Sequence, residues 1–191
     1  MPTGPSLIFR PMRPLIVALM LLALAALGGC GKLDPVSARE FVDAADDAAR
    51  KRFAPEICAL RGENFKLRQK FQSADERMPP TELELDRKLF CVEAGKLGRL
   101  RQYKLERHSL NVDLAADRKT ARVSAVYTET LPYYDPDRRP VTPDDFYEWQ
   151  ILDVRDESVI GFESGDIVFL STDSETRQKL VPKAEIQLPF D

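Results

Sequence analysis

The stretch VDLAADRKTARV, residues 112–123, decides the fold because it predicts two strands joined by a tight turn. Apolar residues alternate with polar ones on both sides of a polar turn at 116–119. A period of two residues places the apolar side chains on one face of a strand. Extended outward, the pattern predicts strands over 103–114 and 121–127, and a slip in the alternation near His108 indicates a β-bulge.

Further strands are expected towards the C-terminus. Strand character resumes over 146–154, and residues 159–170 predict another hairpin around the turn at 164–166. A connection over 131–145 is rich in proline and charge. We expect the tail, 171–191, to form a short helix or to be loosely ordered.

Helices are expected before the central hairpin in the sequence. Asp34 and Pro35 form a helix start, and apolar residues then recur every three or four positions to about Arg52. After a break, a short helical turn carries Cys58, and residues 65–72 alternate as a strand. A polar loop over 73–80 precedes Thr81 and Glu84, whose spacing predicts a capping box and a second helix to about Leu97.

This order of elements predicts an α+β domain in which N-terminal helices pack on a curved antiparallel sheet. On the element order over 35–170 and the 112–123 hairpin, the chain resembles the NTF2-like, or cystatin-like, superfamily of cone-shaped domains. We expect a single domain over 35–191, a length that suits one core.

The N-terminus resembles a bacterial lipoprotein signal. Two arginines precede an apolar run over 15–27, too short for the roughly 20 residues that a transmembrane helix needs. Leu27-Gly28-Gly29-Cys30 then resembles the lipobox, in which the cysteine is acylated. The resemblance implies a signal peptide over 1–29, a lipid on Cys30, a tether over 30–34 and a periplasm-facing domain anchored in the membrane. Gly31 favours the outer over the inner membrane, and an ordinary secretory signal is the alternative.

Two cysteines remain for the domain, Cys58 and Cys91. Export to an oxidising compartment favours a disulfide between them, with two buried free thiols as the alternative. His108 is the only histidine, so we expect neither a catalytic triad nor a zinc site, and we expect no cofactor.

No catalytic residue is assigned from sequence, because no spacing of reactive side chains is diagnostic. The resemblance implies a cavity between sheet and helices, to which five residues on expected strands could contribute: Asp113, Tyr127, Tyr147, Glu148 and Trp149. Alternation favours burial of Tyr147 and Trp149 with Glu148 in solvent rather than a catalytic Glu148.

Protein binding is the leading functional hypothesis from the sequence. The formal net charge is −3, without the basic stripe that nucleic acid would favour. Tyr133 and Tyr134 stand in the proline-rich connection, whose aromatic and arginine side chains suit contact with a protein partner in envelope assembly or immunity. The alternative is a small-molecule binder or enzyme. An enclosed pocket above roughly 300 Å³ holding a carboxylate and a tyrosine would favour the alternative.

Overall fold

The computed structural model describes residues 31–100, 102–133, 148–182 and 185–186. The chain divides into two units, 1–32 and 33–191, and every described helix and strand belongs to the second. The elements are helices α2 (Pro35–Lys51), α3 (Ala54–Ala59) and α4 (Arg87–Leu97), and strands β1 (Arg61–Gln72), β2 (Thr81–Asp86), β3 (Lys104–Leu114), β4 (Thr120–Pro132), β5 (Glu148–Glu163) and β6 (Asp166–Pro182). No helix among the described residues is long and apolar enough to cross a membrane.

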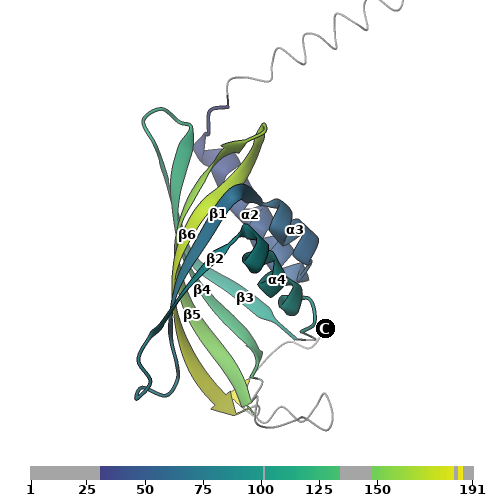
Figure 1. Cartoon of the computed structure of the whole chain (residues 1–191), viewed down its shortest axis with the longest axis vertical. Helices are drawn as coiled ribbons and strands as arrows, with labels where there is room; N and C mark the ends of the chain where they lie inside the picture. Colours follow the sequence, from purple (N-terminus) through teal and green to yellow (C-terminus); the bar gives the residue numbers. More distant parts are fainter. Residues whose placement is uncertain (1–30, 101, 134–147, 183–184, 187–191) are drawn as a thin grey trace, which may run out of the picture. The chain divides into compact units, whose positions relative to one another are not determined.

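Six strands form one curved sheet in the order β2-β1-β6-β5-β4-β3, and the three helices lie together against one face of it (Figure 1). Among the described strands, only the β1–β6 pair is parallel. The predicted hairpin is confirmed as β3–β4, with Val112 opposite Val123. The register shift between Arg107 and Ser109 confirms the bulge at His108.

Helix α2 begins as the sequence predicts. Asp34 is the N-cap, and its Oδ1 accepts hydrogen bonds from the backbone N–H groups of Val36 (2.9 Å) and Ser37 (3.1 Å). These bonds satisfy donors that have no partner within the helix. Leu33, in the expected tether, is fully buried and its N–H donates to the Arg118 carbonyl at 2.7 Å.

The core fills the space between α2 and the sheet at one end of the two layers. Phe41 of α2 contacts Phe169 of β6, with ring centroids 4.9 Å apart. The buried residues of this cluster are Leu33, Ala38, Phe41, Val42, Phe65, Ala121, Val123, Ile160 and Phe169. Large apolar side chains therefore close this end of the domain.

The two remaining cysteines join α3 to α4. Cys58 and Cys91 lie at disulfide distance, with Cα atoms 5.5 Å apart. A small second cluster, Ala48, Ile57 and Ala94, lies where the three helices meet. The disulfide therefore holds the helical layer together above the sheet.

Three expectations about elements are wrong. Thr81 and Glu84 start no helix: they belong to β2, which pairs with β1, and the N-cap of α4 is Asp86, whose Oδ1 accepts from the Leu89 N–H at 2.8 Å. The tail is neither helical nor loose over 171–182, because β6 pairs there with both β1 and β5. Residues 148–154 and 159–162, which were expected to form two strands, belong to one continuous strand, β5.

Candidate functional site

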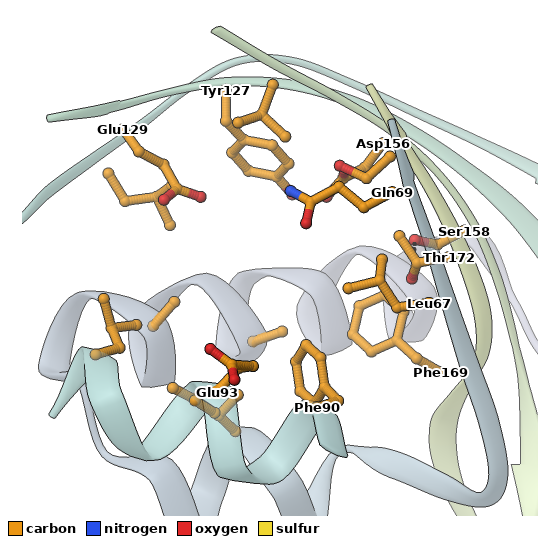
Figure 2. Close-up of a pocket in the computed structure, with 18 of the residues that line it drawn as sticks. Leu67, Gln69, Phe90, Glu93, Tyr127, Glu129, Asp156, Ser158, Phe169 and Thr172 are labelled. Carbon is orange, nitrogen blue, oxygen red and sulfur yellow. Dashed lines mark hydrogen bonds between the residues drawn. The ribbon is translucent and has the colours of Figure 1, made fainter. Parts of the chain in front are cut away.

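A cavity of about 310 Å³ lies between the sheet and the helices, beyond the end that the core closes. Figure 2 shows side chains entering it from both layers: Tyr127, Glu129 and Asp156 from the sheet, and Phe90 and Glu93 from α4 on the opposite side. The volume is at the lower end of the range for small-molecule pockets, which begins at roughly 300 Å³. The cavity is therefore large enough to hold a small molecule.

Strand register explains why polar side chains gather here. Asp156 of β5 lies opposite Ala125 of β4 and Ser174 of β6, and Ser174 in turn lies opposite Gln69 of β1. Paired residues in adjacent strands point to the same face. A row of polar residues, Gln69, Ser174 and Asp156, therefore crosses the cavity wall.

Asp156 is the most isolated carboxyl of this wall. Its Oδ1 is buried and has no hydrogen-bond partner among the described residues. Burial raises the pKa of Asp156 to about 6, although a hydrogen bond with Ser174 and the positive charge of Arg61 act in the opposite direction. At neutral pH the group is mostly ionised, yet it binds a proton far more readily than an exposed aspartate does.

Glu129 is a second carboxyl with a raised pKa. It follows Tyr127 by two residues on β4, so both side chains point into the cavity. Burial, together with the charge of Asp156, raises the pKa of Glu129 to about 7, and the nearby Tyr103 hydroxyl acts in the opposite direction. Near pH 7 Glu129 is therefore divided between its acid and base forms.

Two tyrosines complete the titratable groups of the cavity. Burial raises the pKa of Tyr103 and of Tyr127, and neighbouring carboxylates raise both further: Glu129 acts on Tyr103, and Asp46 acts on Tyr127. Both hydroxyls therefore keep their protons at neutral pH. The Tyr103 hydroxyl donates to Glu129 and the Tyr127 hydroxyl to Asp46, so a ligand meets their oxygens as hydrogen-bond acceptors.

Asp46 of α2 lies at the edge of the cavity in an ion pair. Its Oδ2 accepts from Nη1 of Arg107 at 2.6 Å, and the other terminal nitrogen of Arg107 donates to Asp43 at 2.6 Å. Burial raises the pKa of Asp46, and the charges of Arg107 and Arg50 oppose the rise. This group is thus tied to the helix–sheet contact, unlike Asp156.

Arg61, at the start of β1, brings a positive charge into the same cavity. Its guanidinium lies over three phenylalanine rings, with the carbon 4.3 Å from the centroid of Phe169, 4.7 Å from Phe90 and 5.3 Å from Phe65. Burial lowers the pKa of Arg61 to about 10, so the group remains charged at neutral pH.

Among the residues singled out from sequence that the structure describes, only Tyr127 lines this cavity. Trp149 is buried as expected, but it stands three positions before Leu152 and five before Val154, which line the cavity. It therefore lies on the other face of β5. Tyr133 is half-buried and does not line the cavity.

Tyr134, Tyr147 and Cys30, with residues 1–29, lie outside the described residues, as does the side chain of Glu148.

The other two residues considered for a site lie elsewhere. Asp113 is exposed and accepts from Asn111 at 2.8 Å. His108 is also exposed, and its Nε2 lies 2.8 Å from the Thr128 hydroxyl. The described part of the chain holds no group of three or more His, Cys, Asp or Glu side chains arranged to bind a metal ion.

The cavity residues that the sequence did not single out include the four on which the argument depends: Asp156, Glu129, Tyr103 and Arg61. Alternation could have found Glu129, because it stands two residues after Tyr127 on an expected strand. Asp156 had a weaker signal, since it falls between the two strands expected over 146–154 and 159–162. Nothing in the local sequence marks Arg61 as a cavity residue.

Similar solved structures support the fold. A scytalone dehydratase-like protein from Novosphingobium aromaticivorans DSM 12444 has 13% sequence identity and a TM-score of 0.51, covering 90% of this chain and 93% of the other. LinA has 7% identity and a TM-score of 0.53, with coverage of 82% and 96%. This chain has the NTF2-like fold. The expected α+β class, with helices on a curved sheet, is confirmed.

A hexachlorocyclohexane dehydrochlorinase, LinA-type3 from Novosphingobium barchaimii LL02, is similar at 9% identity and a TM-score of 0.50, covering 82% of this chain and 97% of that one. At such identities the likeness concerns the fold alone. No family model matches the sequence, and the comparison with curated proteins finds no match.

Proposed function

We propose that the domain binds a small organic molecule in the cavity and catalyses proton transfer on it. One observation carries the proposal: two carboxyls with raised pKa values, Asp156 and Glu129, line one cavity of about 310 Å³. Perturbed carboxyls in a pocket are typical of acid–base sites, and two different pKa values allow two different roles.

The roles follow from the two values. Asp156, with the lower pKa, is the base: its carboxylate takes a proton from a C–H bond of the ligand. The electron pair of that bond forms a double bond as a leaving group departs with its own bonding pair. Glu129, partly protonated near pH 7, gives its proton to the leaving group, so protons and electrons balance.

The names of two structural neighbours are consistent with such a reaction. A dehydratase removes water and a dehydrochlorinase removes hydrogen chloride, and both reactions are eliminations. The proposal for this chain nevertheless depends on its own carboxyls and tyrosines, because the likeness concerns the fold.

A deuterium assay tests the proposal. The full-length protein is incubated in D₂O with small molecules extracted from cell envelopes, and mass spectrometry follows deuterium uptake or loss of a leaving group. We expect Asp156→Asn to slow any such conversion about 100-fold or more.

The matched control is Asp153→Asn, on the same strand. Asp153 pairs with Lys179 at 2.6 Å and does not line the cavity, so its loss should leave the rate unchanged. A wild-type protein that converts no compound, or an equal effect of both substitutions, would contradict the proposal.

We also propose that Cys30 carries a lipid that anchors the domain in the cell envelope, facing the periplasm, in the outer rather than the inner membrane. The lipobox-like Leu27-Gly28-Gly29-Cys30 and the following Gly31 support this. Cys30→Ala should abolish incorporation of labelled palmitate and move the protein out of the membrane pellet, whereas Cys58→Ala should keep the label. Labelled Cys30→Ala protein would refute the anchor.

Binding of a protein partner remains an untested hypothesis. The connection that motivates it runs over 131–145, most of which lies outside the described residues. The cavity has the size and the carboxyl and tyrosine groups that favour the small-molecule alternative, so we place that alternative first.

A further inference from the structure

Arg61 is a buried charge that the proton-transfer reaction does not use. Its Nε and Nη1 atoms are shielded from solvent and have no hydrogen-bond acceptor among the described residues. Aromatic rings stabilise a cation, but they replace neither water nor an anion as hydrogen-bond acceptors. A buried guanidinium without an acceptor is costly, so an anion entering the cavity would be strongly favoured here.

Asp156 lies near Arg61, but it accepts no hydrogen bond from Nε or Nη1 of Arg61. Asp156 is close enough for its charge to raise the pKa of Arg61. Even so, Nε and Nη1 of Arg61 and Oδ1 of Asp156 all remain without a hydrogen-bond partner among the described residues. A ligand with an anionic group and a neighbouring donor would satisfy both side chains.

The surroundings of Arg61 also indicate the character of the rest of the ligand. Phe65, Phe90 and Phe169 surround the guanidinium, and Leu67 lines the adjoining wall. An apolar body would bury its surface against these side chains. The size of the cavity restricts that body to a small molecule.

We propose that the ligand is a small organic acid whose carboxylate binds Arg61 and whose apolar part contacts the phenylalanine rings. This inference rests on the proposed small-molecule function and names its ligand class. Guanidinium–carboxylate hydrogen bonds are charge-assisted and roughly twice as strong as neutral ones. Arg61 should therefore bind an organic acid more tightly than the corresponding uncharged amide.

Ligand-observed NMR on the full-length protein in detergent tests this inference. The probes are acetate, phenylacetate and cinnamate, each beside its uncharged amide. We expect at least one acid to bind at least about tenfold more tightly than its amide, the difference expected when a buried charge loses its partner. Arg61→Gln should remove this preference while changing the affinity of the amide less than about twofold.

Two variants separate charge from packing. Arg61→Lys keeps the positive charge and should retain a preference for the acid, which also covers the case in which Arg61→Gln fails to fold. Arg68→Gln is the matched control, since Arg68 is on the same strand but exposed and paired with Asp173 at 2.7 Å. It should bind the probes as the wild type does.

The outcomes distinguish this inference from the proposed function. Equal binding of acids and amides would overturn carboxylate recognition and leave a small-molecule cavity in place. Failure of every acid to bind would overturn the inference, while the deuterium assay would still decide the proposed reaction. Loss of the preference in Arg68→Gln, but not in Arg61→Gln, would also overturn it.

Discussion

Replacing Asp156 by asparagine should stabilise the domain, and the gain should grow as the pH rises. The reason is the raised pKa of Asp156, about 6 in the folded chain against 3.8 as the ordinary value. Between these values the folded state holds a proton that the unfolded state has lost. Stability therefore falls as the pH rises from 3.8 to 6 and is then constant, in contrast to an aspartate with a lowered pKa.

The size of the effect follows from the two pKa values. A difference of one in pKa is worth about 1.36 kcal/mol, so full ionisation of Asp156 costs the folded state about 3 kcal/mol at pH 8. At pH 4.5 Asp156 is protonated in the folded state, and its raised pKa lowers the free energy of unfolding by only about 1 kcal/mol. Asparagine does not titrate, so the stability gain from Asp156→Asn should increase by about 2 kcal/mol between pH 4.5 and pH 8.

Urea denaturation at the two pH values measures this difference. With a slope of about 2 kcal/mol per molar urea, the extra gain corresponds to a midpoint shift of about 1 M. Groups that do not interact with Asp156 titrate equally in both proteins and cancel in the difference. Glu129 does not cancel, because its pKa depends on the charge of Asp156. The control Asp153→Asn removes only an exposed ion pair and should change the urea midpoint little. A gain from Asp156→Asn that is equal at both pH values would show that burial does not raise the pKa of this carboxyl.

Three further predictions concern the surroundings of the site. In Asp156→Asn the pKa of Glu129 should fall below about 7, because the charge of Asp156 helps to raise it. ¹³C NMR of the Glu129 carboxyl measures this pKa, and an unchanged value would show that the two groups are independent. Replacing both Cys58 and Cys91 by alanine should lower the free energy of unfolding by roughly 3–4 kcal/mol, because the bond closes a loop of 33 residues; equal melting of oxidised and reduced wild type would contradict this. Arg107→Gln leaves the buried Asp46 without its closest partner and should lower the free energy of unfolding, measured by urea denaturation, by about 2–3 kcal/mol, less than for a fully enclosed ion pair. A loss no larger than that of Arg68→Gln would be evidence against this prediction.

Local sequence signals predicted the elements whose apolar residues repeat clearly. The β3–β4 hairpin and α2 follow from such repeats and from the Asp34 cap. At Thr81 the local signal was misleading, because the sequence matches a capping box but the segment forms a strand that pairs with β1. Leu85 of this strand lies opposite Leu67. Tertiary pairing overrides a local preference of this size, since a cap contributes only about 1 kcal/mol.

The polar strand β6 shows why the site itself was hard to predict. Its inward-facing residues Thr172, Ser174 and Thr176 are buried but polar, so the alternation between apolar and polar residues disappears. The same holds for Asp156, which occupies a cavity-facing position that would be apolar in a filled core. Polar residues at these positions remove the alternation by which a strand is recognised in a sequence, and the same residues line the cavity.

The cavity stays open because of where large and small residues stand along the two layers. Phe41 and Phe169 fill the contact at the core end and set the separation between α2 and the sheet there. Farther along, the helices present Ala45, Ala49 and Ala94 to the cavity, and these side chains are too short to fill the space between the helices and the sheet. Close packing would bury Asp156 and Arg61 without solvent or ligand at a large energetic cost. The alanines thus leave room for a molecule that these two groups can bind.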